Sequence, residues 1–485
     1  MPALTSPVGI PAGPPVASGP HRRCAAGAAM FCLALALWVG AVPGPGQAHG
    51  QGALPVTAME APAAPAAPAA PDAPDAQDAQ DAQDAHAGHG GHAAHGSAGS
   101  AATGDPYRAL SAGSCQEPTL ACARAASPFF DREGALWLAW SGGGAISVAR
   151  STDLGVTFGA RTEIARHPGT LDTGPDARPQ IVGDDRGNLL VAYGCFRDKQ
   201  WNAQDNVATS HDNGHTFAPA RPVSADPSSQ RFPSLSVNAD GRIFLAWIDK
   251  RLVAAASTSG QKKAGGSIAT AWSMDGGSTF SGERIAYDDS CECCRIAVAL
   301  DGRGLPVLVF RAIFPGSVRD HAVLEFAAPD GAVATHRVAN DGWKTDACPH
   351  HGPALAISGP GTYHAAWFTQ GQARQGTFYA RSRDRGVHFT APRPVGNPKA
   401  QPGRAALLAR GEHVWLAWKE FDGRRASVMI QDSTDDGLTW SAPGKVAEVT
   451  GYSDHPLLVA QAGKVYLSWL TTANGYRLIE VGRTP

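Results

Sequence analysis

The stretch Ser210-His-Asp-Asn-Gly-His-Thr-Phe217 decides the fold, because its pattern Ser-x-Asp-x-Gly-x-Thr-Phe recurs along the chain. Copies occupy 151–158 and 273–280, and slightly altered copies occupy 382–389 and 433–440. The five starts lie 59, 63, 109 and 51 residues apart, and a degenerate copy near 329–331 divides the longest gap. In such a motif the carboxylate accepts backbone N–H bonds, the glycine takes a positive φ and the aromatic ring turns inward. Each copy therefore predicts a tight turn.

A second repeat runs out of phase with the first. Short alternating segments that end in an aromatic residue occur at 136–140, 190–193, 244–247, 307–310, 364–367, 415–418 and 466–469. A shorter apolar strand precedes each of them, as at Pro118-Thr119-Leu120 and Pro179-Gln180-Ile181. Repeats of about 50 residues with four short strands are typical of a β-propeller. We therefore expect an all-β propeller of four-stranded blades, with seven blades favoured over six, in which Tyr107–Leu110 supplies the outer strand missing from the last unit.

Composition agrees with this fold and excludes one class of partner. The 485 residues include 56 Gly and 37 Pro, as expected for a turn-rich β protein. With 41 Lys and Arg against 43 Asp and Glu, the formal net charge is -2. Because the chain carries no basic excess to neutralise phosphates, we expect no nucleic-acid partner.

The first 104 residues differ in character from the rest. Residues 1–48 have the pattern of a signal peptide, with Arg22 and Arg23 ahead of an apolar run over 25–42 and small residues before the cleavage point at Ala48. This predicts a periplasmic or secreted protein without a membrane span after cleavage, the alternative being an uncleaved anchor. Residues 49–104 predict a disordered Ala/Pro/Asp/His-rich linker that either binds metal or acts as a spacer. The regularly spaced linker histidines are His86, His89, His92 and His95.

A candidate metal site follows from aligning the units of the propeller domain, 105–485. The residues just before each inner strand gather at one mouth of the central channel. The motif Cys-Glu-Cys-Cys-Arg at 291–295 would then lie beside Asp-Ala-Cys-Pro-His-His at 346–351. Thiolates and imidazoles suit a copper or zinc ion, with copper slightly preferred. The predicted metal ligands are Cys291, Cys293, Cys294, Cys348, His350, His351 and His455.

The cysteines also allow other interpretations. A disulfide from Cys291 or Cys294 to Cys348, a redox-active thiol, or a disulfide beside a metal-binding histidine pair would each use the same residues. Cys115 and Cys122 would form a local disulfide, and Cys195 is expected to be a buried small residue.

The Ser-x-Asp-x-Gly-x-Thr-Phe repeat resembles the Asp box, and 105–485 is similar to the sialidase-like Asp-box (BNR repeat) propellers over nearly all of its length. An active member of that family is an exo-sialidase-type glycoside hydrolase with a tyrosine nucleophile, three arginines that clamp a carboxylate, and an aspartate acid/base. The family's Tyr/Phe-Arg-Ile-Pro motif is replaced here by Gln116-Glu117-Pro118, and the nearest equivalent, Arg231-Phe232-Pro233, lies two units later. The resemblance would give the catalytic roles to Tyr452, to three of Arg178, Arg231, Arg295 and Arg404, and to Asp172 or Asp176.

Three functions are consistent with these observations. The first is an exported propeller that binds a soft metal ion at its channel mouth, in metal handling. The second is a sialidase-type hydrolase acting on a small glycan, so the question whether the protein is an enzyme stays open. The third is a scaffold that binds an envelope protein.

Overall fold

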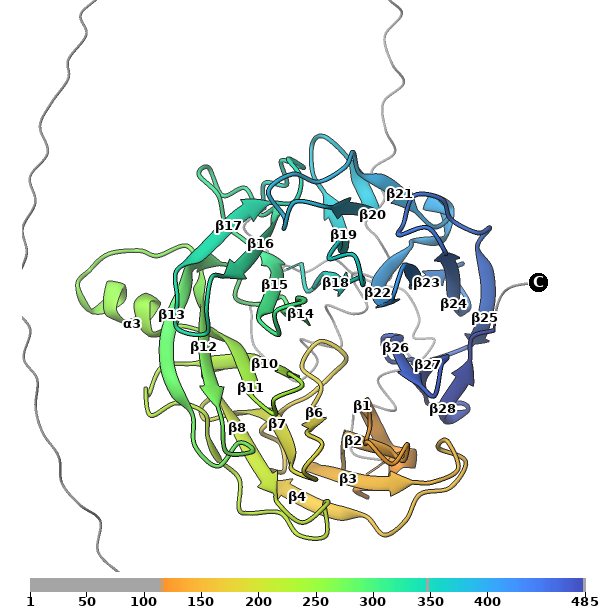
Figure 1. The fold of residues 1–485 in the computed structure, drawn as a ribbon. Helices are drawn as coiled ribbons and strands as arrows, with labels where there is room; N and C mark the ends of the chain where they lie inside the picture. Colours follow the sequence, from red (N-terminus) through yellow and green to blue (C-terminus); the bar gives the residue numbers. More distant parts are fainter. Residues whose placement is uncertain (1–114, 116, 346–348, 483–485) are drawn as a thin grey trace, which may run out of the picture. The chain divides into compact units, whose positions relative to one another are not determined.

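The protein is described by a computed structural model covering residues 115, 117–345 and 349–482. These residues are almost entirely β and form seven antiparallel sheets around a common axis, which confirms the predicted seven-bladed propeller (Figure 1). The predicted signal peptide 1–48, the linker 49–104 and the strand Tyr107–Leu110 lie outside the described residues. Within the described ranges, every helix is too short or too polar to cross a bilayer.

The strands of each blade are hydrogen-bonded in chain order, except that the second blade carries an additional short strand paired with its central strand. The first three blades comprise β1 (Ala123–Phe130), β2 (Leu136–Gly142), β3 (Ala145–Ser151) and β4 (Thr162–Arg166); β5 (Leu171–Asp172), β6 (Gln180–Gly183), β7 (Leu189–Phe196), β8 (Ala203–Ser210) and β9 (Arg221–Pro222); and β10 (Gln230–Val237), β11 (Ile243–Asp249), β12 (Gly266–Ser273) and β13 (Ser281–Ser290). The last four comprise β14 (Ala297–Leu300), β15 (Pro306–Arg311), β16 (His321–Phe326) and β17 (Val333–Arg337); β18 (Ala354–Ile357), β19 (Tyr363–Gln370), β20 (Gln375–Ser382) and β21 (Arg393–Val395); β22 (Gly403–Arg410), β23 (His413–Phe421), β24 (Ala426–Ser433) and β25 (Gly444–Val449); and β26 (Leu457–Gln461), β27 (Lys464–Thr471) and β28 (Gly475–Glu480).

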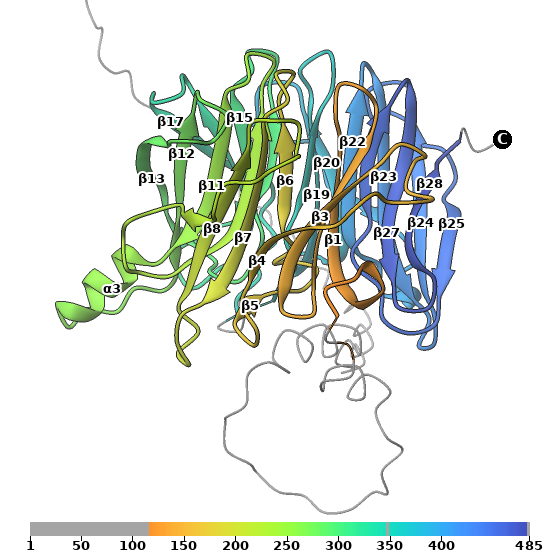
Figure 2. The same cartoon turned by 90° about the horizontal axis from the view of Figure 1, so that it is seen from below.

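The aromatic segments of the second repeat form the second strand of every blade. The strand that precedes each of them lies nearest the channel (Figure 1), and the strands run between the two faces of the ring (Figure 2). The first blade differs from the prediction, because Leu120–Cys122 is a 3₁₀ turn and β1 begins at Ala123. A disulfide joins Cys115 to Cys122 and holds their Cα atoms 5.5 Å apart, whereas seven extended residues would span about 23 Å. The segment must therefore turn.

The Ser-x-Asp-x-Gly repeats form the turns that follow the third strand of their blades. The glycine of each turn has a positive φ, at Gly155, Gly214, Gly277, Gly386 and Gly437. A side chain at Gly214 would also collide with Trp137 of the first blade, because a Cβ there would lie 2.1 Å from the indole ring. Glycine is therefore required both by the backbone conformation and by packing between blades.

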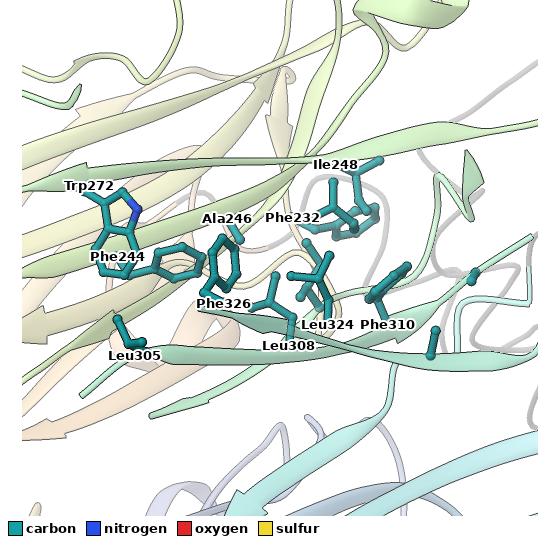
Figure 3. Packing of buried hydrophobic residues seen from close by; sticks show 14 residues of the cluster. Phe232, Phe244, Ala246, Ile248, Trp272, Leu305, Leu308, Phe310, Leu324 and Phe326 are labelled. Carbon is teal, nitrogen blue, oxygen red and sulfur yellow. The ribbon is translucent and has the colours of Figure 1, made fainter. Parts of the chain in front are cut away.

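The hydrophobic core lies between neighbouring blades. Between the third and fourth blades, Phe244 packs edge-on against Trp272 and Phe326, with ring centroids 4.7 Å and 5.5 Å apart (Figure 3). Leu308 and Phe310 of β15 belong to the same buried cluster. Alternation along β11 and β15 directs one set of side chains to each neighbouring blade, because successive residues point to opposite faces of a strand.

The ring closes where the seventh blade meets the first. The seventh blade has three strands among the described residues. The Tyr452 hydroxyl donates to the Arg124 carbonyl oxygen at 2.7 Å, and Asp454 Oδ2 accepts the Ala126 N–H at 3.0 Å. Side chains ahead of β26 therefore fasten the last blade to β1.

Candidate functional site

The channel mouth is formed by the segments that lead into the innermost strands, as the alignment of the units predicts. Asp176 precedes β6, Arg295 precedes β14, Arg404 lies at the start of β22 and His455 precedes β26. Arg295 Nη1 donates to Asp176 Oδ1 at 2.8 Å, and Arg404 Nη1 donates to Asp176 Oδ2 at 3.3 Å. His455 Nδ1 lies 3.7 Å from Asp176 Oδ1. Side chains of three other blades thus converge on a carboxylate of the second blade.

Burial and nearby positive charges determine the protonation states of Asp176 and His455. Burial alone would raise the pKa of Asp176, but the charges of Arg404 and Arg295 outweigh it and hold that pKa below its usual value. The pKa of His455 is held well below its usual value, first by burial and then by the charges of nearby cations. Those cations are Arg404, Lys419, Arg295 and Arg178. His455 is therefore neutral in a strongly cationic surrounding.

The two other arginines assigned to a carboxylate clamp are paired with carboxylates of the chain. Arg178, which is buried, donates from Nη2 to Asp454 Oδ1 at 2.7 Å. Arg231 donates to both oxygens of Asp172, from Nε at 2.6 Å and from Nη2 at 2.9 Å, and its guanidinium lies over the Phe232 ring. A bidentate pair of this kind is among the strongest polar contacts in proteins.

Three of the predicted metal ligands form a cluster in the turn between β13 and β14. The sulfur atoms of Cys291, Cys293 and Cys294 all lie within 4.8 Å of one another. Cys291 Sγ is 3.5 Å from Cys293 Sγ and 3.6 Å from Cys294 Sγ, and all three residues are buried. The turn is tied to β15, because the Cys291 N–H donates to the Arg311 carbonyl at 2.9 Å.

Positive charge also surrounds the thiols. Arg319 Nη1 donates to Cys291 Sγ at 3.3 Å. Hydrogen bonds from Cys293 and Cys294, together with the charge of Arg311, outweigh burial and hold the pKa of Cys291 well below its usual value. Burial raises the pKa of Cys294 to about 12. Of these two thiols, Cys291 is therefore the one that its surroundings favour as a thiolate.

Among the described residues, the histidines assigned as metal ligands lie outside the thiol triangle. The carbonyl of His350 accepts from Arg404, and the ring of His351 stacks on Phe368 with centroids 4.1 Å apart. His455 lies at Asp176. Cys348 is outside the described residues. Metal ligation by these four residues stays a prediction.

The other cysteines behave as simpler structural residues. Cys115 and Cys122 form the local disulfide that the sequence allowed. Cys195 is half-buried, its Sγ accepts from Asn206 Nδ2 at 3.4 Å, and burial raises the pKa of its thiol.

Several charged residues at the mouth were missed from the sequence. Arg311 and Lys419 directly follow the apolar segments 307–310 and 415–418. A charged residue at the end of a buried strand is therefore the sequence signal that could have predicted them. Both are buried, and Lys419 Nζ donates to the Ser453 carbonyl at 3.3 Å. Arg319 lies in the loop between β15 and β16, where nothing in the sequence marks it.

Comparison with known proteins identifies the fold. No protein-family model matches the chain, and no curated protein matches it. An ulvan lyase of polysaccharide lyase family 25 superposes with a TM-score of 0.50 at 12% identity, covering 73% of this chain and 91% of the lyase. The BP39L lectin from Burkholderia pseudomallei gives 0.50 at 12% identity, covering 74% and 99%. A Hadza microbial sialidase gives 0.43 at 17%, covering 72% and 73%. The lyase and the lectin share the propeller fold with this chain, and neither assigns it an activity.

Proposed function

We propose that this protein binds one soft metal ion, copper(I) ahead of zinc(II), through the thiolates of Cys291, Cys293 and Cys294, and that it handles metal ions outside the cytoplasm. The observation that carries the proposal is the triangle of buried sulfur atoms. Three sulfurs bonded to one metal at about 2.3 Å would stand about 4 Å apart. The sulfur separations of 3.5 Å and 3.6 Å need only a small expansion to reach that arrangement.

The chemistry of the donors supports a soft ion. Thiolate sulfur selects copper(I), zinc(II) and iron–sulfur clusters over magnesium or calcium, which prefer oxygen ligands. The Cys291 sulfur is also the atom at which the surroundings favour negative charge. Since a thiolate rather than a thiol binds metal, this preference lowers the cost of forming the site.

The sialidase-type alternative has less support from the same mouth. Arg178, Arg231 and Arg295 each hold a carboxylate of the chain, so a substrate carboxylate would have to displace an internal ion pair. The Tyr452 hydroxyl donates to a backbone carbonyl of β1, which gives it a place in ring closure. The fold is shared with a glycan lyase and a lectin, and the paired arginines do not favour a carboxylate clamp.

Metal content measured on the full chain tests the proposal. To remove the imidazoles of the linker, its histidines would be changed to alanine at His49, His86, His89, His92 and His95. After anaerobic loading with copper(I) and desalting, elemental analysis should give about one ion per chain. The variant Cys291→Ser/Cys294→Ser should lose it, whereas the matched control Cys195→Ser should keep it. A protein without bound metal, or equal metal in the double variant, would refute the proposal.

A further inference from the structure

The thiol cluster is bordered by two buried guanidinium groups that were not among the predicted ligands. Arg319 reaches the cluster directly, with Nη1 3.3 Å from Cys291 Sγ. Its Nε donates to the Thr345 carbonyl at 2.8 Å, and its backbone N–H donates to the Trp343 carbonyl at 2.8 Å. These contacts fix the position of the guanidinium, so its charge is preorganised beside the sulfur.

Arg311 is the second guanidinium. It is 1% exposed, and its side chain donates to the carbonyl oxygens of Arg319, His351 and Phe368 at 2.9–3.1 Å. Its backbone is hydrogen-bonded to Cys291, and its charge acts on the sulfurs of both Cys291 and Cys294. Neutral carbonyl oxygens orient this side chain without cancelling its charge.

The net charge of the loaded site depends on the ion. Three thiolates with a monovalent ion carry a net charge of about -2, whereas the same thiolates with a divalent ion carry about -1. Adjacent guanidinium groups stabilise the more negative complex more strongly, and the effect is large in a buried site because little water screens it. A soft monovalent ion also accepts three sulfur ligands, whereas zinc prefers four.

We infer that Arg319 and Arg311 make this site selective for a monovalent soft cation, copper(I), over divalent zinc(II). The inference rests on the proposed function, because it concerns the same three thiols. The two arginines do not bind the ion; their positive charges act on it through the thiolates that do.

The test is the ratio of zinc(II) to copper(I) dissociation constants, measured anaerobically by competition with chromophoric chelators on the full chain without linker histidines. Arg319→Gln should shift this ratio toward zinc by about tenfold or more, because the copper complex loses the larger charge stabilisation. Arg319→Lys keeps the charge and should restore most of the preference. Arg381→Gln removes a buried arginine that contacts Asp436 in a Ser-x-Asp turn, and it should leave the ratio unchanged.

The outcomes separate the two claims. If Arg319→Gln lowers both affinities by the same factor, or changes neither, while binding still depends on Cys291 and Cys294, the selectivity inference is wrong and the proposed function stands. If the unaltered thiols bind neither ion, both are wrong. If Arg319 had only a structural role, Arg319→Gln would weaken the binding of both ions together. Arg319→Lys would then not restore the ratio of the two dissociation constants.

Discussion

In the turn over 210–217, Ser210 Oγ donates to Asp212 Oδ1 at 2.7 Å and accepts the Gly214 N–H at 2.9 Å. The Thr216 N–H and hydroxyl then donate to the two oxygens of Asp212. The turn that begins at Ser433 has the same bonds within 0.1 Å. At the residue scale, the repeated motif specifies its own turn, since the side-chain oxygens of Ser210, Asp212 and Thr216 all have partners inside the turn.

Loss of one hydroxyl should therefore cost stability. Ser210 is 1% exposed, so Ser210→Ala leaves the Gly214 N–H buried without its acceptor. We expect the free energy of unfolding to fall by about 1–2 kcal/mol, measured by urea denaturation. Ser257→Ala, at an exposed position of the helix α3 (Arg251–Thr258), should stay within about 0.5 kcal/mol of the parent. Equal small losses in both variants would contradict this account of the turn.

At the element scale, the second strand of each blade combines an apolar ladder with a polar end. Trp247, Trp367 and Trp418 are fully buried, and their indole N–H groups donate to Asp249, Asp341 and Glu420 at 2.7–2.9 Å. A buried indole needs such a partner. Alternation and the terminal aromatic residue predicted these strands. Asp249 and Glu420 lie two residues beyond their tryptophans on the same strand, whereas Asp341 comes from the segment between β17 and β18, whose position only the assembled blade defines.

His364 on β19 makes the stability of the protein depend on pH. It is fully buried, its Nδ1 lies 2.7 Å from the Tyr379 hydroxyl, and burial lowers its pKa to about 4 despite nearby Asp436. Because the unfolded chain binds this proton near pH 6.5 and the folded chain only near pH 4, stability is lost as the pH falls through that window.

The decrease in the free energy of unfolding that His364 causes amounts to at most about 3 kcal/mol. Urea unfolding at pH 7, 5.5 and 4.5 should show a shallower decline for His364→Gln than for the parent protein. His211→Gln, which replaces an exposed histidine, should follow the parent. Parallel pH profiles for all three proteins would contradict the assignment.

At the scale of the whole molecule, the alignment of the units predicted much of the mouth and missed part of it. Asp176, Arg295 and Arg404 meet as expected, because equivalent positions of a ring of blades must face the same axis. Arg319 was missed because it reaches the thiols from a loop between β15 and β16, and no repeat marks that loop. Tyr452, to which the family resemblance gave a catalytic role, fastens the seventh blade to the first together with Asp454.

The ring thus brings three thiols of a single turn and two arginines of the same blade into one buried site at the mouth. No comparison with known proteins addresses that site, so its chemistry rests on the geometry of these residues. We propose that the three sulfurs bind one metal ion together.

X-ray absorption at the copper edge would identify the atoms bound to the ion. The full chain without linker histidines would be loaded anaerobically with one equivalent of copper(I). We expect a shell of three sulfur atoms at about 2.3 Å and a loss of sulfur scatterers in Cys291→Ser/Cys294→Ser. A shell of nitrogen or oxygen alone, unchanged in that variant, would contradict this proposal.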